Sequence, residues 1–314
     1  LAKELGITVG IIGCNWGGSS ASNWISEQNL SEDKDLNTYL EEYYKGIEGK
    51  SEEEQIREYK EYEAYMANWG KKCDEQIALN PSIEWEELLK ICGEWKWPGF
   101  LYYQGESDDH KPGMYQKLPT RLIYQWREDW EEPTLPFLIV QLPMFQGKND
   151  PDSKSWCLFR EAQMNTYQTV KNTGIAVILD CGEFNEIHPK DKTPVGERLA
   201  LQALFQVYHK VNEKDAFGPI YKAHQFKDSG IEISFDYADE GFDLKGEARG
   251  FEIAGEDKNY VNASIDIWGS KIFLSSSEID KPMYARYCWT NYGEVTIFGR
   301  NGIPLAPFRT SNKA

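Results

Sequence analysis

The sequence lacks several features that would point to a membrane, metal or redox protein. No window approaches the roughly 18 uncharged apolar residues that a membrane-spanning helix needs. Its six cysteines are scattered, without a Cys-x-x-Cys pair or a Cys/His ligand spacing, so no zinc site is expected. Unpaired thiols of this kind are usually buried, and they favour a reducing compartment slightly over an oxidising one.

Basic residues are also in the minority. The chain has 34 Lys and Arg against 51 Asp and Glu, which gives a net charge of −17. An acidic surface repels nucleic acid and anionic lipid, so neither is expected as a partner. The first residues, Leu1 to Gly6, contain no initiator Met and no signal-peptide pattern. We therefore expect a piece of a longer chain or a product of processing.

What is present is enough apolar material for a large core. Hydrophobic residues make up 40% of the 314 residues, a length that suits two domains. Short apolar runs alternate with longer stretches of helical periodicity, which implies a parallel sheet covered by helices on both faces. The predicted strands are residues 7–13, 97–103, 137–142 and 175–179, and the predicted helices are two within 52–92, then 114–130, 161–170 and 194–211.

The pattern changes after about residue 213. Short alternating apolar runs separated by Gly, Asp, Asn and Ser are typical of antiparallel β structure. We therefore expect one domain over residues 1–213 and a smaller antiparallel β domain over 214–314. The expected strands of the second domain are residues 231–237, 251–254, 263–268, 271–274 and 284–289.

Three polar motifs follow predicted strands of the parallel sheet. Asn15-Trp16-Gly17-Gly18 comes after the first strand, Gln104-Gly-Glu-Ser after the second, and the run from Glu183 to His188 after the last. In an open parallel sheet, chemistry gathers beyond the carboxyl ends of the strands. The motifs are therefore expected to share one edge.

His188 is the strongest single candidate. An imidazole is the side chain best suited to move protons near neutral pH, and a nearby carboxylate can fix its tautomer. Glu186 lies two residues upstream of it, and Asp180 lies at the end of the strand. The other three histidines are expected in a solvated loop, late in a helix and in the β region, and they are His110, His209 and His224.

The glycine pair Gly17-Gly18 and the Gln104 amide are candidate oxyanion donors. Paired glycines let backbone N–H groups face a ligand, and a Gln amide can donate to a developing oxyanion. Plain turns explain both motifs equally well. Glu106 could orient the histidine or bind a sugar hydroxyl, or it could simply lie in a polar turn.

Other candidate residues can be explained by ordinary structural roles. The hydroxyls of Ser19, Ser20 and Ser22 lie outside any Gly-x-Ser-x-Gly elbow and suit helix caps better than a nucleophile. Arg160 could bind a substrate carboxylate, although an Arg near a helix start is more often an ordinary ion-pair partner.

Taken together, the motifs resemble the sialate O-acetylesterase family of carbohydrate esterases, in the SGNH-hydrolase superfamily. The resemblance runs over nearly the whole chain in the family's order, and only the acidic helical stretch at about residues 30–95 looks like a variable insert. The matching pieces are Val9-Gly-Ile-Ile, Asn15-Trp-Gly-Gly, Tyr103-Gln-Gly-Glu-Ser, Trp126-Arg127, Val140-Gln-Leu, Arg160-Glu-Ala-Gln, Ile187-His-Pro with Lys192, Val195-Gly-Glu-Arg-Leu-Ala-Leu, Gly250-Phe-Glu-Ile-Ala-Gly, Arg286-Tyr-Cys-Trp and Gly302-Ile-Pro-Leu-Ala-Pro-Phe-Arg.

The resemblance implies an α/β fold, with an SGNH-like parallel sheet flanked by helices and a smaller antiparallel β domain after it. His188 would be the general base and later the general acid, and Gly17, Gly18 and Gln104 would supply oxyanion donors. Glu186 or Glu106 would orient His188, although the family typically has Asp where Glu186 stands. Trp16 and Arg160 are the candidate substrate-binding residues, and no metal or other cofactor is implied.

One element of the family's pattern is missing. Its nucleophilic serine lies in a Gly-Gln-Ser-Asn motif upstream of the Trp-Gly-Gly block, and these 314 residues contain no such motif. We therefore expect the first strand of the sheet and its serine to come from a segment outside this sequence, such as an N-terminal fragment of the same enzyme. The favoured function is hydrolysis of O-acetyl esters on sugars such as sialic acid or hemicellulose units. The alternative is a non-catalytic carbohydrate-binding protein derived from the same fold.

Overall fold

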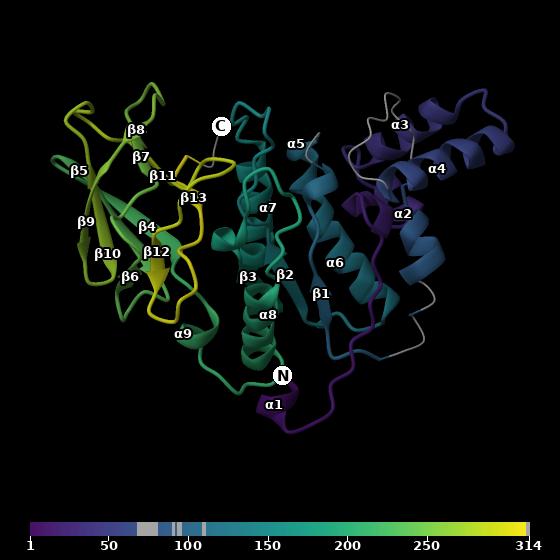
Figure 1. Cartoon of the computed structure of the whole chain (residues 1–314), viewed down its shortest axis with the longest axis horizontal. Coiled ribbons are helices and arrows are strands. Elements are labelled where there is room, and N and C mark those ends of the chain that lie inside the picture. The colour runs from purple at the N-terminus through teal and green to yellow at the C-terminus, as the bar shows by residue number, and fades with distance from the viewer. Residues whose placement is uncertain (68–80, 90–91, 93–95, 109–110, 312–314) are drawn as a thin grey trace. The chain divides into compact units, whose positions relative to one another are not determined.

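The computed structural model describes residues 1–67, 81–89, 92, 96–108 and 111–311 (Figure 1). The chain divides into two compact units. The sheet unit comprises residues 1–6, 98–103 and 136–314, and the helical unit comprises residues 7–97 and 104–135. The division expected at about residue 213 stays a prediction.

A three-stranded parallel sheet lies in the sheet unit. Its order is β1-β2-β3, with β1 at Phe100–Tyr102, β2 at Phe137–Gln141 and β3 at Thr173–Val177. Every residue of β2 and β3 is buried, which explains why both appear as unbroken apolar runs. Helices α7 (Ser155–Thr169) and α8 (Thr193–Gln206) pack against these strands (Figure 1). Three of the four predicted parallel strands are thus confirmed.

The fourth predicted strand is wrong. Residues 7–13 form no strand, and Ile7, Ile11 and Ile12 are 53%, 80% and 59% exposed. An apolar run becomes a strand only where a neighbouring strand satisfies its backbone, and no described strand pairs with this segment. These isoleucines therefore remain a large exposed apolar surface.

Short helices make up the helical unit. The helix expected over residues 114–130 is interrupted, because Pro119 has no N–H to donate to the carbonyl of Tyr115. The second helix expected within residues 52–92 falls largely outside the described residues. The elements are η1 (Ala21–Trp24), α2 (Glu27–Ser31), α3 (Asn37–Ile47), α4 (Glu52–Ala67), the π-helical turn η2 (Trp85–Leu89), η4 (Glu106–Asp108), α5 (Pro112–Tyr115) and α6 (Leu118–Asp129).

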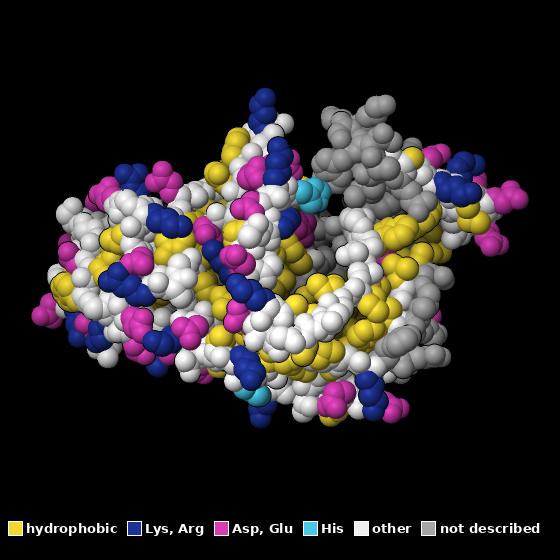
Figure 2. Space-filling view, turned by 60° about the horizontal axis from the view of Figure 1, so that its bottom comes forward, with side chains coloured by type: hydrophobic (Ala, Val, Ile, Leu, Met, Phe, Trp, Pro, Cys, Tyr) yellow, Lys and Arg dark blue, Asp and Glu magenta, His cyan; other side chains and the backbone are white. Residues whose placement is uncertain are grey.

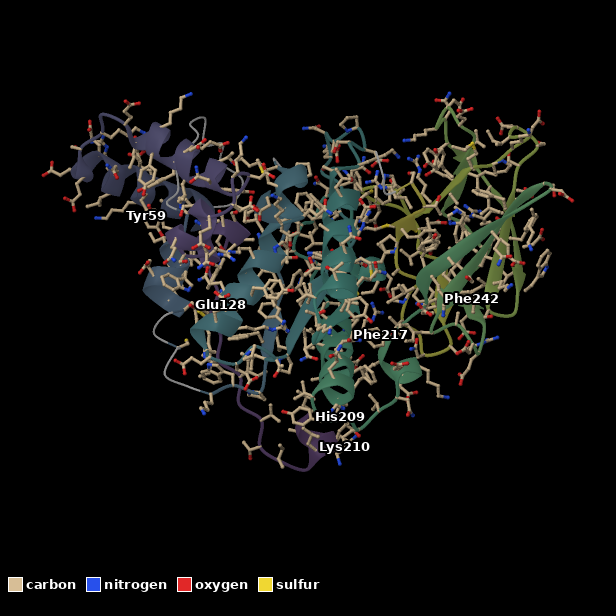
Figure 3. The ribbon with its side chains drawn as sticks, turned by 180° about the vertical axis from the view of Figure 1, so that it is seen from behind. Tyr59, Glu128, His209, Lys210, Phe217 and Phe242 are labelled. Atoms are coloured by element: carbon tan, nitrogen blue, oxygen red, sulfur yellow. The ribbon has the colours of Figure 1, made fainter. Side chains whose placement is uncertain are left out.

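Antiparallel strands fill the C-terminal part of the sheet unit, as expected. They form sheets of order β4-β5-β10-β9, β13-β11-β7-β8 and β12-β6. Phe217 and Phe242 lie in a core that these strands share with Ile175 of β3 and Met164 of α7 (Figure 3). The remaining elements are α1 (Ala2–Leu5), α9 (Glu213–Ala216), β4 (Ile220–Lys227), β5 (Gly230–Asp236), β6 (Phe242–Leu244), β7 (Phe251–Ala254), β8 (Val261–Asn262), β9 (Ser264–Trp268), β10 (Lys271–Ser275), β11 (Tyr284–Tyr287), β12 (Ile297–Gly299) and β13 (Phe308–Arg309).

The surface carries its charges in a mixed pattern. On the face shown in Figure 2, Lys and Arg side chains are interspersed with Asp and Glu. The net charge of −17 is therefore not gathered into one acidic field on that face. No helix among the described residues is long and apolar enough to cross a membrane.

One fully buried carboxylate organises the helical unit. Asp108 is 0% exposed and accepts hydrogen bonds from Ser20 Oγ at 2.5 Å, Ala21 N at 2.9 Å and Gln104 Nε2 at 2.7 Å. A more distant Tyr39 hydroxyl lies 3.5 Å away. A buried carboxylate is tolerated only where donors of this kind replace its water. Asp108 therefore joins the start of η1 to the loop after β1.

Replacing this acceptor should destabilise the chain. Asp108→Asn turns an amide N–H₂ toward groups that are themselves donors. We expect it to lower the free energy of unfolding by about 2–4 kcal/mol, measured by urea denaturation followed through tryptophan fluorescence. Asp266→Asn, at an exposed position of β9, is the matched control and should change it by less than about 0.5 kcal/mol. Equal denaturation midpoints for the two variants would contradict the role given to Asp108.

Candidate functional site

The loop that carries His188 leaves the carboxyl end of β3. A 3₁₀ turn, η5 (Leu179–Cys181), leads into a tight turn closed by an antiparallel bridge between Glu183 and Glu186. Asn185 in this turn has a positive φ of 58°, a conformation that Asn tolerates well. His188 follows and is exposed, and α8 begins five residues later at Thr193. His188 thus lies at the predicted edge of the parallel sheet.

Two carboxylates hold the backbone of this loop. Glu186 Oε1 accepts the main-chain N–H of His188 at 2.9 Å, and Glu183 Oε1 accepts that of Lys190 at 2.8 Å. The first bond holds the Glu186 carboxylate against the residue that it was predicted to orient. Orientation of the imidazole by Glu186 stays a prediction.

A buried ion pair fixes both ends of the loop. Arg198 of α8 donates from Nη1 to Asp180 Oδ1 at 2.5 Å and from Nη2 to Oδ2 at 2.9 Å, and Nη1 also reaches the Val177 carbonyl at 2.9 Å. The two side chains are only 10% and 17% exposed. Burial opposes the charge on Arg198, but the hydrogen bonds and charge of Asp180 raise its pKa on balance. Both carboxylate oxygens of Asp180 are thus bonded to Arg198.

The cysteine next to this pair has a raised pKa. Burial and then the charge of Asp180 raise the pKa of the Cys181 thiol to about 11. Burial likewise raises the pKa of Cys288 to about 12. Thiols with these pKa values stay protonated near neutral pH and react slowly. Both cysteines are free, as are the other cysteines among the described residues.

The predicted oxyanion donors come together in the helical unit. Gly18 has a φ of 77°, which favours glycine, and Ser19 Oγ closes the turn by donating to the Trp16 carbonyl at 2.8 Å. Gln104 Nε2 donates to the Ser19 carbonyl at 3.3 Å and to Asp108 at 2.7 Å. The Gln104 amide is therefore held beside the glycine turn. The longer of the two bonds, to the Ser19 carbonyl, is the weaker one. An oxyanion could therefore replace that carbonyl as the acceptor at the smaller energetic cost. Oxyanion stabilisation by these groups stays a prediction.

The serines after the glycine pair have structural contacts. Ser20 is the N-cap of η1, and its hydroxyl accepts from Ser22 N and donates to Asp108. Ser19 Oγ accepts the indole N–H of Trp24 at 2.9 Å. These bonds agree with the helix-cap interpretation. Trp16, the candidate substrate residue of this segment, is 41% exposed.

Two further candidates are placed less clearly for chemistry. Glu106 is the first residue of η4 and is half-buried, and its partnership with His188 stays a prediction. Arg160 of α7 is 0% exposed and donates from Nη2 to the carbonyls of Cys288, at 3.4 Å, and Thr290, at 2.5 Å. Its substrate-binding role also stays a prediction, and the geometry favours anchoring of the loop after β11.

The other described histidines lie away from this edge. His209 follows the end of α8, which runs back from the His188 loop, and it lines a pocket with Phe205 and Lys214 (Figure 3). That pocket is therefore at the opposite edge of the sheet. His224 of β4 contacts the Tyr221 hydroxyl at 2.7 Å, and burial lowers its pKa. His110 lies outside the described residues.

Sequence reasoning missed Asp108, Arg198 and the contacts of the loop after β11. Asp108 stands two residues after Glu106, but only its contact with Ser20, 88 residues away in the sequence, reveals its role. Arg198 lies in the quoted Val195-Gly-Glu-Arg motif without a signal for its partner. Across the described ranges, no three His, Cys, Asp or Glu side chains are arranged to hold a metal ion.

The chain is similar to known acetylesterases. Residues 83–204 match the family described as carbohydrate esterase, sialic acid-specific acetylesterase. The chain is 22% identical to the sialate O-acetylesterase of Mus musculus, over 98% of this chain and 61% of that protein. The human sialate O-acetylesterase is 28% identical over 42% of this chain and 28% of that protein.

A solved structure extends the likeness to three dimensions. The crystal structure of a carbohydrate acetylesterase from Xanthomonas citri superposes with a TM-score of 0.79 and 26% identity, over 99% of this chain and 63% of that one. The chain thus spans about three fifths of the length of both the mouse protein and this structure. The family match, the relatives and the shared fold thus make the chain similar to sialate and carbohydrate acetylesterases.

Proposed function

We propose that this chain is part of a serine esterase that releases acetate from O-acetylated sugars. The observation that carries the proposal is the position of His188, exposed on a loop at the carboxyl edge of the parallel sheet. The Asp180–Arg198 pair and the Glu186 bond hold that loop in place. The names of the relatives, which are sialate or carbohydrate acetylesterases, supply the substrate class.

The residues divide the reaction between them. His188 takes the proton of a serine hydroxyl as that oxygen attacks the acetyl carbonyl. Backbone N–H groups at Gly17 and Gly18, with the Gln104 amide, stabilise the tetrahedral oxyanion. His188 then returns the proton to the departing sugar oxygen. A water molecule, activated by the same imidazole, hydrolyses the acetyl-enzyme.

The serine would come from a segment outside these residues. The chain contains no Gly-Gln-Ser-Asn motif. Within the described part of the sheet unit, β1 has a strand on one side only, and its Leu101 is 52% exposed. In the helical unit, the apolar run at residues 7–13 is exposed as well. Unpaired strand edges and exposed apolar runs are surfaces that an added strand would cover.

A specific observation also favours a second candidate, a carbohydrate-binding protein without catalysis. Trp268 of β9 is 57% exposed, and its ring stacks on Phe273 of β10 at 5.5 Å and 10°. Exposed tryptophans of this kind offer a flat surface to a sugar ring. On this alternative, the chain would bind saccharides through Trp268 and His188 would have no chemical role.

Removal of the imidazole separates the two candidates. In the chain assembled with its serine-bearing segment, we expect His188→Ala to lower kcat for p-nitrophenyl acetate by at least about 1,000-fold, because no other group accepts the serine proton. The circular dichroism spectrum should not change, since His188 is exposed. Unaltered turnover of His188→Ala would rule out His188 as the base, whereas absence of turnover in the assembled parent protein would favour the binding protein.

The chain alone should lack esterase activity. We expect no p-nitrophenyl acetate hydrolysis above background from residues 1–314. Activity should return when a segment with Gly-Gln-Ser-Asn is added, and should not return when that serine is replaced by Ala. Intact mass and N-terminal sequencing of the purified protein identify the segment. A serine-independent turnover by residues 1–314, abolished by His188→Ala, would show that the nucleophile is elsewhere in this chain.

The acid partner of His188 can be identified with matched variants. Glu186→Gln keeps an acceptor for the His188 N–H but removes the charge. We expect kcat of the assembled enzyme to fall by at least about 100-fold with little change in KM, because the imidazolium loses its counter-charge. Glu106→Gln is the comparison, and a larger loss from that variant would transfer the role to Glu106.

A further inference from the structure

An aromatic pair links the loop that carries His188 to the loop after β11, through an exposed Phe184 and a half-buried Tyr292. Phe184 occupies the turn between Glu183 and Glu186 and is 54% exposed. Its ring centroid is 5.7 Å from that of Tyr292, at an interplanar angle of 62°. In an edge-to-face pair, one ring keeps both of its faces clear of the other. A large apolar surface is thus held in solvent where burial would be favourable.

The turn under Phe184 is tied to the loop after β2. Asn185 donates its main-chain N–H to the Gln146 carbonyl at 3.0 Å. Its side-chain Oδ1 accepts the N–H of Lys148 at 2.8 Å. Phe184 is therefore presented by a turn whose backbone is bonded on both sides.

The loop that carries Tyr292 is fixed just as firmly. Asp152 accepts from Asn291 N at 2.8 Å and from Thr290 Oγ1 at 2.9 Å. Asn291 Nδ2 donates to Asp150 at 2.6 Å, and the buried Arg160 binds the Thr290 carbonyl at 2.5 Å. Both rings thus stand on ordered loops, so little conformational entropy is lost when a ligand covers them.

The pair lies close to the candidate general base. Phe184 and His188 are four residues apart, which limits their Cα atoms to about 14 Å even in a fully extended chain. The closed turn between Glu183 and Glu186 brings them nearer. Phe184 and His188 are therefore carried by the same short loop.

We propose that Phe184 and Tyr292 form a stacking platform for the pyranose ring of the acetylated sugar. This inference rests on the proposed function for its choice of ligand. Sugar rings present an apolar C–H face, and aromatic side chains supply apolar area for it at low entropic cost. Asn185 is next to Phe184 in the sequence and is bonded to Lys148; both residues are exposed and offer polar groups for the hydroxyls of the sugar, as is usual in small-ligand sites. The platform joins a loop of the parallel sheet to a loop of the antiparallel β region, so both would contribute to substrate recognition.

Saccharide binding to the 314-residue chain tests the platform without requiring the serine. The probes are the methyl glycosides of N-acetylneuraminic acid and of xylose, titrated by NMR with saturation transfer from the aromatic protons. We expect at least one glycoside to bind, and Phe184→Ala and Phe184→Leu each to weaken it by about tenfold or more. Phe184→Tyr should restore the binding, because it keeps the ring that Leu lacks.

An equally exposed aromatic residue gives the control. Phe226 of β4 is 59% exposed, and Phe226→Ala should leave the affinity unchanged. The proposal is overturned if Phe184→Ala binds as tightly as the parent, if Phe184→Leu binds as tightly as Phe184→Tyr, or if neither glycoside binds at tens of millimolar. It is also overturned if Trp268→Ala alone abolishes the binding. Failure of the esterase proposal shows separately, as absence of turnover in the assembled parent protein.

Discussion

The candidate site depends above all on the ion pair between Asp180 and Arg198. It lies almost out of solvent, with both carboxylate oxygens bonded and a third contact to the Val177 carbonyl. Removing one partner of such a pair leaves an uncompensated buried charge, which is costly. The pair joins the residues after β3 to α8, and the His188 loop lies between these two segments. The pair therefore fixes both ends of the loop. The Glu183 and Glu186 bonds then set its backbone.

The loop with Tyr292 is also held by contacts with the sheet unit's core and with α7. Residues of β3, α7 and the antiparallel strands share one apolar core, so the C-terminal strands pack against the parallel part of the sheet unit. Arg160 of α7 donates to the Thr290 carbonyl in the loop after β11. Asp152 accepts hydrogen bonds from Thr290 Oγ1 and Asn291 N in the same loop. The antiparallel β region therefore contacts the His188 loop through the Phe184–Tyr292 pair.

The sequence predicted the elements whose apolar pattern reports burial. Strands β2 and β3 were found because buried strands are apolar throughout, and β1 was found because it is apolar although its Leu101 is exposed. Strand β4 was missed because most of its residues are exposed and pairing with β5 holds it. Residues 7–13 have the pattern of a strand without the pairing partner, which no local pattern can supply. Pro119 is visible in the sequence as a helix breaker. The prediction of one helix over residues 114–130 gave more weight to the hydrophobic periodicity and was wrong there. Strand order in parallel sheets could predict the edge where His188 lies.

Contacts within the His188 loop account for most of its other polar side chains. Asp180 is bound by Arg198, and Glu183 and Glu186 each accept a main-chain N–H, so every carboxylate of the loop supports its structure. Cys181 is kept as a thiol by its raised pKa. A general base must be reachable by substrate and must titrate near neutral pH. Among the described residues of this loop, His188 is the exposed imidazole, and the Glu186 carboxylate binds its main-chain N–H.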